Sequence, residues 1–403
     1  MNKKIIEKVC AAPAIALHRS VRFVGKIGKR EFDLANFRRT HEYWNNLGPG
    51  LITGAADDDP AGITTYSQTG ARYGFQLLWL AGFTFPLMAI VQEMCARIGL
   101  MTGRGLAGNI RINYPRRVLY TCGILLFIAN TFNIGADIGA MAKAIELIIP
   151  GSNFLVLAIL ITLFSLLLQI YTSYEQYAKY LKYLALVLLA YVVSAFLTNI
   201  DIRELIMHTL VPSLTFSKDQ LFLITAILGT TISPYLFFWQ TSQEVEEEIL
   251  KGKTSLRLRQ GTTKEDINKM RVDSWSGMFF SNAIMYFIIA ACATTLYKHG
   301  INNIETAADA AKALQPIAGN NAFLLFALGI VGVGLLAVPV LAGSAAYTIA
   351  ESFGWRSGLY RKLQQAPAFY GVIIFSMLIG LLINFIGIDP IKMLIYSGVV
   401  NGL

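Results

Sequence analysis

Three consecutive aspartates and a proline lie in the middle of an apolar segment, and this feature constrains the fold more than any other. The acids Asp57, Asp58 and Asp59 precede Pro60 within residues 47–74. One aspartate at the centre of a membrane helix costs about 2.5–3.5 kcal/mol on insertion scales, so three in a row cannot face lipid. Because Pro60 lacks an N–H group and disfavours helix at Asp59, we expect the helix to break there and to leave backbone carbonyls free as ligands.

The rest of the chain is a series of apolar segments, most of them near the ~20 residues that a bilayer requires. Hydrophobic residues make up 55% of the 403 and charged residues only 15%, against roughly 25% charged residues in average soluble domains. This composition excludes a disordered chain and most soluble enzymes, and it predicts an all-α polytopic membrane protein. The expected spans are residues 47–74, 76–100, 117–146, 153–171, 181–199, 219–243, 274–297, 321–350, 367–387 and 390–403. We expect the last helix to be truncated, since it is short and stops at Leu403.

Basic residues alternate between loops, and this alternation predicts the orientation. Most of the 34 Lys and Arg residues lie in the N-terminal tail and in the loops after segments two, four, six and eight. Cytoplasmic loops of membrane proteins carry such an excess of basic residues. We therefore expect residues 1–45 to form a basic cytoplasmic tail of a protein of the cell membrane. The net charge of +9 then reflects topology and does not indicate nucleic-acid binding.

The sixth segment carries a second helix break. Gly229 and Pro234 flank small polar residues in mid-membrane. Proline alone often kinks a membrane helix without a functional role. Segments one and six are, however, equivalent if the chain consists of two five-helix halves, and an odd number of spans makes these halves inverted. Broken helices at matching positions of inverted repeats indicate a transporter's central site, because unwound backbone at that depth is tolerated only where it lines a cavity.

Several motifs resemble the NRAMP family of divalent-metal transporters. They are Gly48-Pro49-Gly50-Leu51, Asp59-Pro60-Ala61-Gly62, Gln68-Thr69-Gly70-Ala71, the stretch from Gln92 to Ala107, and the stretch from Gly229 to Pro234. The resemblance covers roughly residues 46–403. It implies a LeuT-like fold of two inverted five-helix repeats, residues 46–200 and 201–403, in which helices one and six are broken.

The resemblance also implies a metal site with unusual ligands. The family uses an Asp and an Asn from an Asp-Pro-Gly-Asn break, an Ala carbonyl and a Met thioether from helix six, and a nearby Gln on helix ten. Here Asp59 keeps the Asp, and Gly62 stands where the Asn is expected. Thr230 occupies the Ala position, Ser233 replaces the Met, and Gly398 stands where the Gln would be.

These departures favour a hard, partly hydrated ion. A thioether is a soft ligand that favours transition metals, so its loss removes that discrimination, and three smaller side chains widen the cavity. Mg²⁺ dehydrates reluctantly and binds through one or two carboxylates while keeping several waters. We therefore expect a secondary transporter of Mg²⁺, and also of Mn²⁺, that works by alternating access and is most similar to the NRAMP-related magnesium transporters. The metal is then the substrate, and no cofactor is expected.

Proton coupling is expected to be weak or absent. The family places a His after the helix-six Pro and acids on helix three, whereas this chain has Tyr235 at the first position and Asn133 and Asp137 on helix three. Tyrosine, with a pKa near 10, does not cycle protons near neutral pH, a task that histidine usually performs. The remaining pathway candidates are Asp57 and Asp58, which either add negative potential and hold water near the metal or only pack against other helices.

Other functions stay open at this stage. They are a proton-coupled Mn²⁺/Fe²⁺ importer of the classical NRAMP type, a LeuT-like carrier of an organic substrate, and a divalent-cation channel. The acidic break disfavours an anionic substrate group, and two broken helices favour a carrier over a channel. No HExxH, GxSxG or Ser/His pair occurs in the spans, so an intramembrane enzyme is not expected. The expected partners are the metal ion and the bilayer, and the sequence leaves the oligomeric state open.

Overall fold

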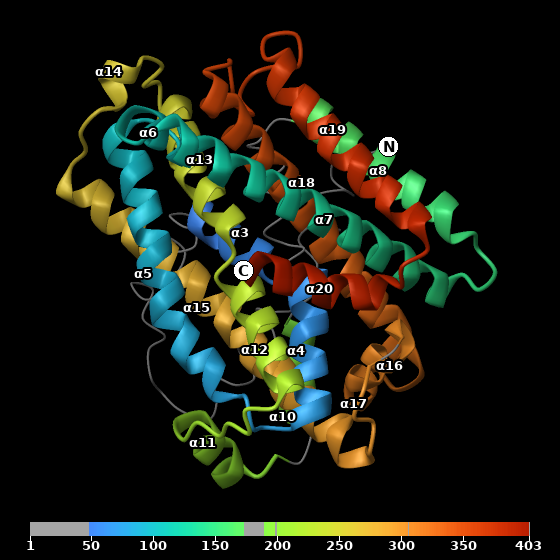
Figure 1. Cartoon of the computed structure of the whole chain (residues 1–403). Coiled ribbons are helices and arrows are strands. Elements are labelled where there is room, and N and C mark those ends of the chain that lie inside the picture. Colours follow the sequence, from blue (N-terminus) through green and yellow to red (C-terminus); the bar gives the residue numbers. More distant parts are fainter. Residues whose placement is uncertain (1–47, 173–188, 198–199, 305, 403) are drawn as a thin grey trace, which may run out of the picture. The chain divides into compact units, whose positions relative to one another are not determined.

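The computed structural model describes residues 48–172, 189–197, 200–304 and 306–402 (Figure 1). The basic tail at residues 1–45 and part of the expected span at 181–199 lie outside these residues. Helices dominate the described ranges, and no strand occurs in them. This confirms the all-α expectation.

Six long helices correspond to expected spans. They are α5 (Trp79–Thr102), α7 (Arg116–Ile148), α8 (Phe154–Tyr171), α15 (Lys264–Thr295), α18 (Ala322–Phe353) and α19 (Pro367–Ile383). Together with residues 218–250, which contain the second break, they give seven candidate membrane spans among the described residues. The last expected span is the 13-residue helix α20 (Pro390–Gly402), which is too short to qualify by length alone.

Both predicted helix breaks are confirmed. The first span consists of α3 (Pro49–Asp57) and α4 (Pro60–Tyr73), with Asp58 and Asp59 between them. The sixth expected span consists of α12 (Lys218–Thr231) and α13 (Pro234–Leu250). In each case a proline begins the second helix, because its fixed φ suits a first helical turn and its missing N–H has no helical partner there.

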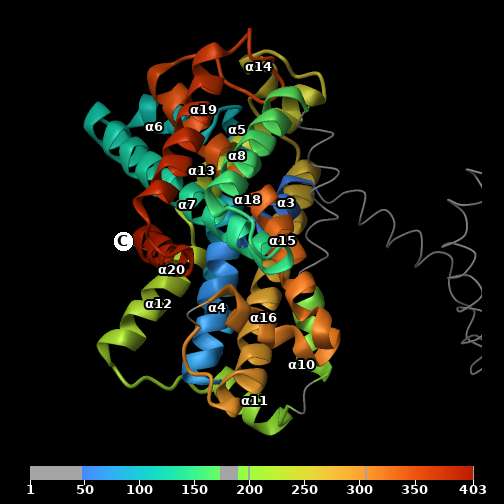
Figure 2. The same ribbon diagram turned by 90° about the vertical axis from the view of Figure 1, so that its right-hand side faces the viewer.

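Shorter helices gather at the two ends of the unit formed by residues from Gly48 onward. At one end lie α6 (Leu106–Asn113) and α14 (Leu256–Arg259), and at the other lie α11 (Ile202–Leu210), α16 (Ala307–Ala311) and α17 (Gln315–Ala318) (Figures 1 and 2). The short helix α10 (Leu189–Leu197) packs beside α15. Helices α5 and α15 run between these ends, whereas α7, α8 and α19 lie obliquely to them (Figure 1).

Small residues allow two close helix contacts that shape the centre. A Cβ atom added to Gly54 on α3 would lie 2.1 Å from the carbonyl oxygen of Gly277 on α15. A Cβ atom added to Gly229 on α12 would lie 2.0 Å from the carbonyl oxygen of Gly398 on α20. Small residues at such crossings let backbones approach closely, as is common in membrane helix packing. The two breaks are thereby pressed against α15 and α20.

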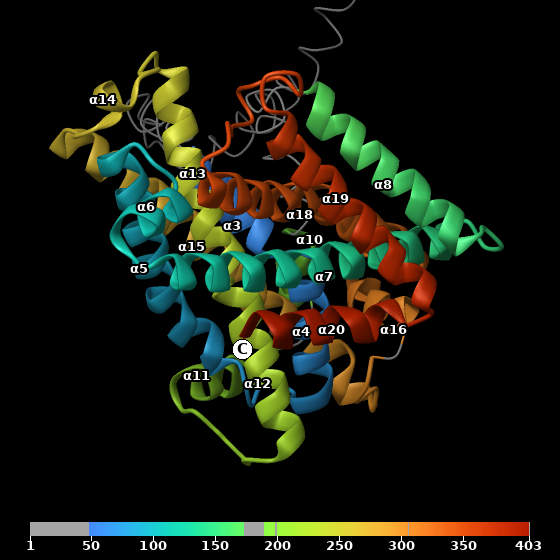
Figure 3. The ribbon, with the colours of Figure 1, turned by 45° about the horizontal axis from the view of Figure 1, so that its top comes forward.

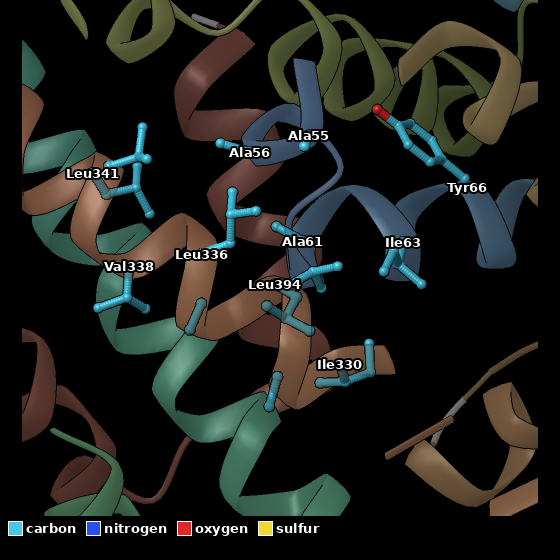
Figure 4. Close-up of a cluster of buried hydrophobic side chains, with 14 of the residues drawn as sticks. Ala55, Ala56, Ala61, Ile63, Tyr66, Ile330, Leu336, Val338, Leu341 and Leu394 are labelled. Atoms are coloured by element: carbon cyan, nitrogen blue, oxygen red, sulfur yellow. The ribbon is translucent and has the colours of Figure 1, made fainter. Parts of the chain in front are cut away.

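The apolar core surrounds the first break. Figure 4 shows Ala55 and Ala56 on α3 and Ala61 on α4 beside the α18 residues Leu336 and Leu341. Helix α7 packs along α18, and α20 runs beside α7 (Figure 3). The break is therefore enclosed by protein and does not face lipid.

Candidate metal site at the two helix breaks

The two breaks lie next to each other. Tyr235, the second residue of α13, donates its hydroxyl to the carbonyl oxygen of Ala56 at 2.9 Å, near the end of α3. Across the gap, the Tyr66 hydroxyl on α4 is 3.3 Å from Thr231 Oγ1 at the end of α12. Because the last carbonyls of a helix have no partner within it, two helix ends bring several backbone oxygens to one place.

Asp59 is held in position by two elements. Its Oδ1 accepts a hydrogen bond from the Gly62 N–H at 2.7 Å and so caps α4, while Oδ2 accepts from Asn133 Nδ2 at 2.8 Å. Asn133 in turn accepts a hydrogen bond from the Ser397 hydroxyl on α20 at 2.7 Å. The carboxylate is only 3% exposed. Each oxygen of an ionised carboxylate has two lone pairs, so both keep the capacity to bind a cation.

The second break supplies neutral oxygens. The Ser233 hydroxyl donates to the carbonyl oxygens of Gly229 at 2.7 Å and of Thr230 at 3.1 Å. The Thr230 hydroxyl donates back to the Ala226 carbonyl at 3.0 Å. Their protons are thus turned toward the backbone, and their lone pairs remain available as hard ligands.

The donor set at the two breaks consists of oxygen atoms. Among the described residues, no three His, Cys, Asp or Glu side chains converge as a metal cage. An ion bound at the breaks would instead meet the Asp59 carboxylate, carbonyl and hydroxyl oxygens, and its own water molecules.

Gly398 contacts the second break through packing. A Cβ atom there would lie 2.9 Å from Thr230 Cγ2 and 3.1 Å from the Ala226 carbonyl oxygen. The structure therefore places Gly398 beside Thr230 and leaves little room for a longer side chain on the present backbone.

The other acids near the first break are buried as well. Asp137 on α7 is fully buried and lies beside the Ala61 backbone at the start of α4. Asp57 and Asp58 are also fully buried and share the Ser281 hydroxyl on α15. Ser281 and Ser397 were not found from the sequence, because a serine in an apolar helix carries no distinctive signal.

The breaks are closed toward the start of α3. Asp273 on α15 accepts hydrogen bonds from the N–H groups of Gly48 at 2.8 Å, Gly50 at 2.7 Å and Leu51 at 3.3 Å. These contacts fix the first turn of α3 and satisfy donors that a helix start leaves free. The sequence did not single out Asp273, because an acid near the start of a span has no evident partner without the fold.

A buried polar chain continues this closure between α3 and α13. The Thr53 hydroxyl donates to Gln240 Oε1, and Gln240 Nε2 donates to Glu244 Oε1 at 2.9 Å. At the other end of the first span, Gln68 on α4 binds the Asn303 side chain at 2.7 Å and the Ile304 N–H at 2.8 Å. The structure thus encloses the breaks from both directions.

Comparison with known proteins gives a consistent result. The family model described as Nramp, natural resistance-associated macrophage protein-like, matches residues 50–403. The divalent metal cation transporter MntH of Klebsiella pneumoniae (strain 342) is 26% identical over 359 residues, which cover 88% of this chain and 81% of that protein. MntH of Yersinia pestis (strain Pestoides F) is 27% identical over 299 residues, covering 73% and 69%.

Solved structures show the same fold. A manganese transporter from Eremococcus coleocola superposes with a TM-score of 0.67 at 16% identity, covering 92% of this chain and 77% of that one. Mhp1, a nucleobase-cation-symport-1 family transporter, superposes with a TM-score of 0.58 at 14% identity, covering 84% and 71%. At these identities the likeness shows the fold alone, and it confirms the expected LeuT-like arrangement.

Proposed function

Since this chain belongs to the Nramp family, we propose that it is a secondary transporter that carries divalent metal cations through the two helix breaks by alternating access. It is a multi-pass membrane protein and not an enzyme, and the metal is its substrate. The curated relatives described above carry the name divalent metal cation transporter, which supports this substrate class.

One observation carries the proposal. The Asp59 carboxylate lies buried at the break between α3 and α4, oriented by Gly62 and Asn133. A carboxylate so placed is expensive to bury and marks an ion pathway in membrane proteins. Helix-terminal carbonyls beside it complete a cation site of the kind that discontinuous helices form in transporters.

We propose Mg²⁺, and also Mn²⁺, as the transported ions. The side chains at Gly62, Thr230 and Ser233 offer no thioether, and hard oxygen ligands suit Mg²⁺ and Mn²⁺. Small residues at these positions leave room for water molecules that Mg²⁺ retains. A divalent ion moving inward across −100 mV gains about 4.6 kcal/mol, from roughly 2.3 kcal/mol per charge, which suffices for accumulation without protons.

A classical proton-coupled importer of Mn²⁺ or Fe²⁺ is the second candidate. The observation in its favour is Asp137, a fully buried carboxyl on α7 beside the first break. Against it, Tyr235 occupies the position after the break where a proton-cycling histidine is expected, and its hydroxyl is engaged by Ala56. Weak or absent proton coupling is therefore part of our proposal.

The topology completes the proposal. We assign residues 46–200 and 201–403 to two inverted repeats, each opening with a broken helix, and we place the N-terminus in the cytoplasm. The basic residues of α6 and α14, at the same end of the unit, support this orientation, because cytoplasmic loops are rich in Lys and Arg.

Competitive uptake into proteoliposomes tests this function. Mg²⁺, Mn²⁺ and Ca²⁺ fluxes are measured for the unaltered chain and for Asp59→Ala, with Asp219→Ala as the control because that acid is largely exposed on α12. We expect Asp59→Ala to abolish the flux of every ion and Asp219→Ala to leave it unchanged. Normal Mg²⁺ flux in Asp59→Ala would exclude Asp59 as a ligand, and iron uptake without Mg²⁺ transport would refute the ion preference.

A further inference from the structure

The unpartnered oxygens between α3 and α4 belong to the two acids before Asp59. Both oxygens of Asp59 accept hydrogen bonds from protein. By contrast, Asp57 Oδ1 and Asp58 Oδ2 are buried and have no hydrogen-bond partner among the described residues. A buried acceptor without a partner loses its hydration without compensation. These two buried oxygens are therefore available to bind a ligand.

No positive side chain of the described residues forms an ion pair with Asp57 or Asp58. The residue that follows them, Asp59, is a third carboxyl. Burying an unpaired charge costs several kcal/mol, and buried charges are accordingly paired with ions of opposite sign or coordinate metals. A cation beside the two carboxylates supplies the pairing that the protein lacks.

Ser281 brings the two carboxylates to one place. Its Oγ lies 2.5 Å from Asp57 Oδ2 and 3.4 Å from Asp58 Oδ1. Ser281 follows Gly277 by one helical turn, and the close contact between Gly277 and Gly54 seats α15 against α3. The single hydroxyl proton is donated to the nearer oxygen, Asp57 Oδ2. Asp57 Oδ1 and Asp58 Oδ2, on two consecutive residues, have no partner among the described residues and can accept a ligand.

The surroundings of these acids are polar enough for a hydrated ion. Tyr66 on α4, fully buried, lies on the helix that follows these acids. Its hydroxyl contacts Thr231 Oγ1 at the end of α12. A tyrosine or threonine hydroxyl can accept a hydrogen bond from a water molecule bound to a metal.

We propose that Asp57 and Asp58, positioned by Ser281, form a second station for a hydrated divalent cation, on the α3 side of Asp59. The proposal rests on the transport function proposed above and extends it from one site to two. Mg²⁺ and Mn²⁺ bind through one or two carboxylates with the rest of the shell supplied by water, so two carboxylate oxygens suffice. Two cations at neighbouring stations repel each other, so each is bound more weakly. This repulsion favours release of the ion along the pathway.

Equilibrium dialysis with Mn²⁺ as the probe tests the second station. The purified full chain in detergent is compared with Asp57→Asn/Asp58→Asn and with Glu265→Gln, a matched acid-to-amide change at an exposed position of α15. We expect two Mn²⁺ ions to bind to the unaltered chain and to Glu265→Gln, and one to the double variant. Electron paramagnetic resonance of the bound Mn²⁺ should show line broadening from two nearby ions, which the double variant loses.

Two further variants keep the outcome interpretable. Ser281→Ala retains both acids and provides the test if the double variant does not fold. We expect it to weaken Mn²⁺ binding at one of the two sites roughly tenfold or more, because loss of a group that orients a metal ligand has an effect of that size. One Mn²⁺ ion on the unaltered chain, or two on the double variant, overturns the second station and leaves the transport proposal intact. Undiminished binding by Asp59→Asn instead counts against the site of the proposed function and not against the second station.

Discussion

Asn133 Nδ2 donates a hydrogen bond to Asp59 Oδ2 at 2.8 Å, and this contact joins α7 to the first helix break. The amide of Asn133 is itself oriented by Ser397 on α20, at 2.7 Å. The chain from Ser397 through Asn133 to Asp59 links three helices that the sequence separates widely. The geometry of the proposed metal ligand therefore depends on the packing of α7 and α20 as well as on its own helix.

Replacing Asn133 by Ala should weaken metal binding more than it weakens the fold. The change removes one charge-assisted hydrogen bond, and loss of a group that orients a metal ligand typically lowers affinity 10- to 100-fold. We expect the apparent KM for Mg²⁺ uptake to rise by about that factor. Ser397→Ala should produce a smaller rise, since it acts through Asn133. An unchanged KM in Asn133→Ala would show that the contact does not position the ligand.

Restoring the thioether at the second break should change the ion preference. Ser233→Met places a soft ligand beside the Thr230 carbonyl, and soft ligands favour transition metals over Mg²⁺. We expect competition uptake to shift toward Mn²⁺ and Mg²⁺ flux to fall at least several-fold. Ser376→Met, at a buried position of α19 away from the breaks, controls for the added volume. If Ser233→Met and the unaltered chain had the same ion selectivity, a thioether at this position would not determine the ion preference.

Metal uptake by the unaltered chain should not acidify the liposome interior. No imidazole lies at the position of Tyr235, whose hydroxyl is buried and bound to Ala56, and a tyrosine does not exchange protons near neutral pH. A pH-sensitive dye trapped inside the vesicles reports this during Mg²⁺ and Mn²⁺ uptake. Metal-driven acidification well above that of empty liposomes would favour the proton-coupled alternative and assign Asp137 a role in it.

Loss of the Asp273 carboxylate should loosen the start of α3. Asp273→Ala deprives three N–H groups of their acceptor, and hydrogen bonds to charged groups contribute about 1.5–3 kcal/mol each. Cys95, buried on α5 beside Thr241, serves as the reporter in a chain whose other three cysteines are serine. We expect a water-soluble maleimide to label Cys95 at least tenfold faster in Asp273→Ala. Equal labelling rates with normal transport would exclude Asp273 as a positioning residue for α3.

The sequence by itself determined the features that depend on local chemistry. The breaks at Asp59-Pro60 and Ser233-Pro234 follow from proline's missing N–H and fixed φ, and the structure confirms both. The long apolar helices follow from the apolar composition and the length of the segments, because the core of a bilayer is apolar and a helix needs ~20 residues to cross it. The resemblance of Gly48 to Gly62 and of Gly229 to Pro234 to one family was likewise readable along the chain, and the family match confirms it.

Only the tertiary structure decided which side chains meet the breaks. Ser281 reaches Asp57 across 224 residues, Ser397 reaches Asn133 across 264, and Asp273 reaches Gly48 across 225. No local pattern identifies these partners, because each contact exists only after two distant helices pack, and that packing depends on glycine contacts such as Gly54 with Gly277. The choice of partners is a property of helix packing, since a side chain's neighbours across an interface are set by the joint geometry of both helices and not by either sequence segment alone.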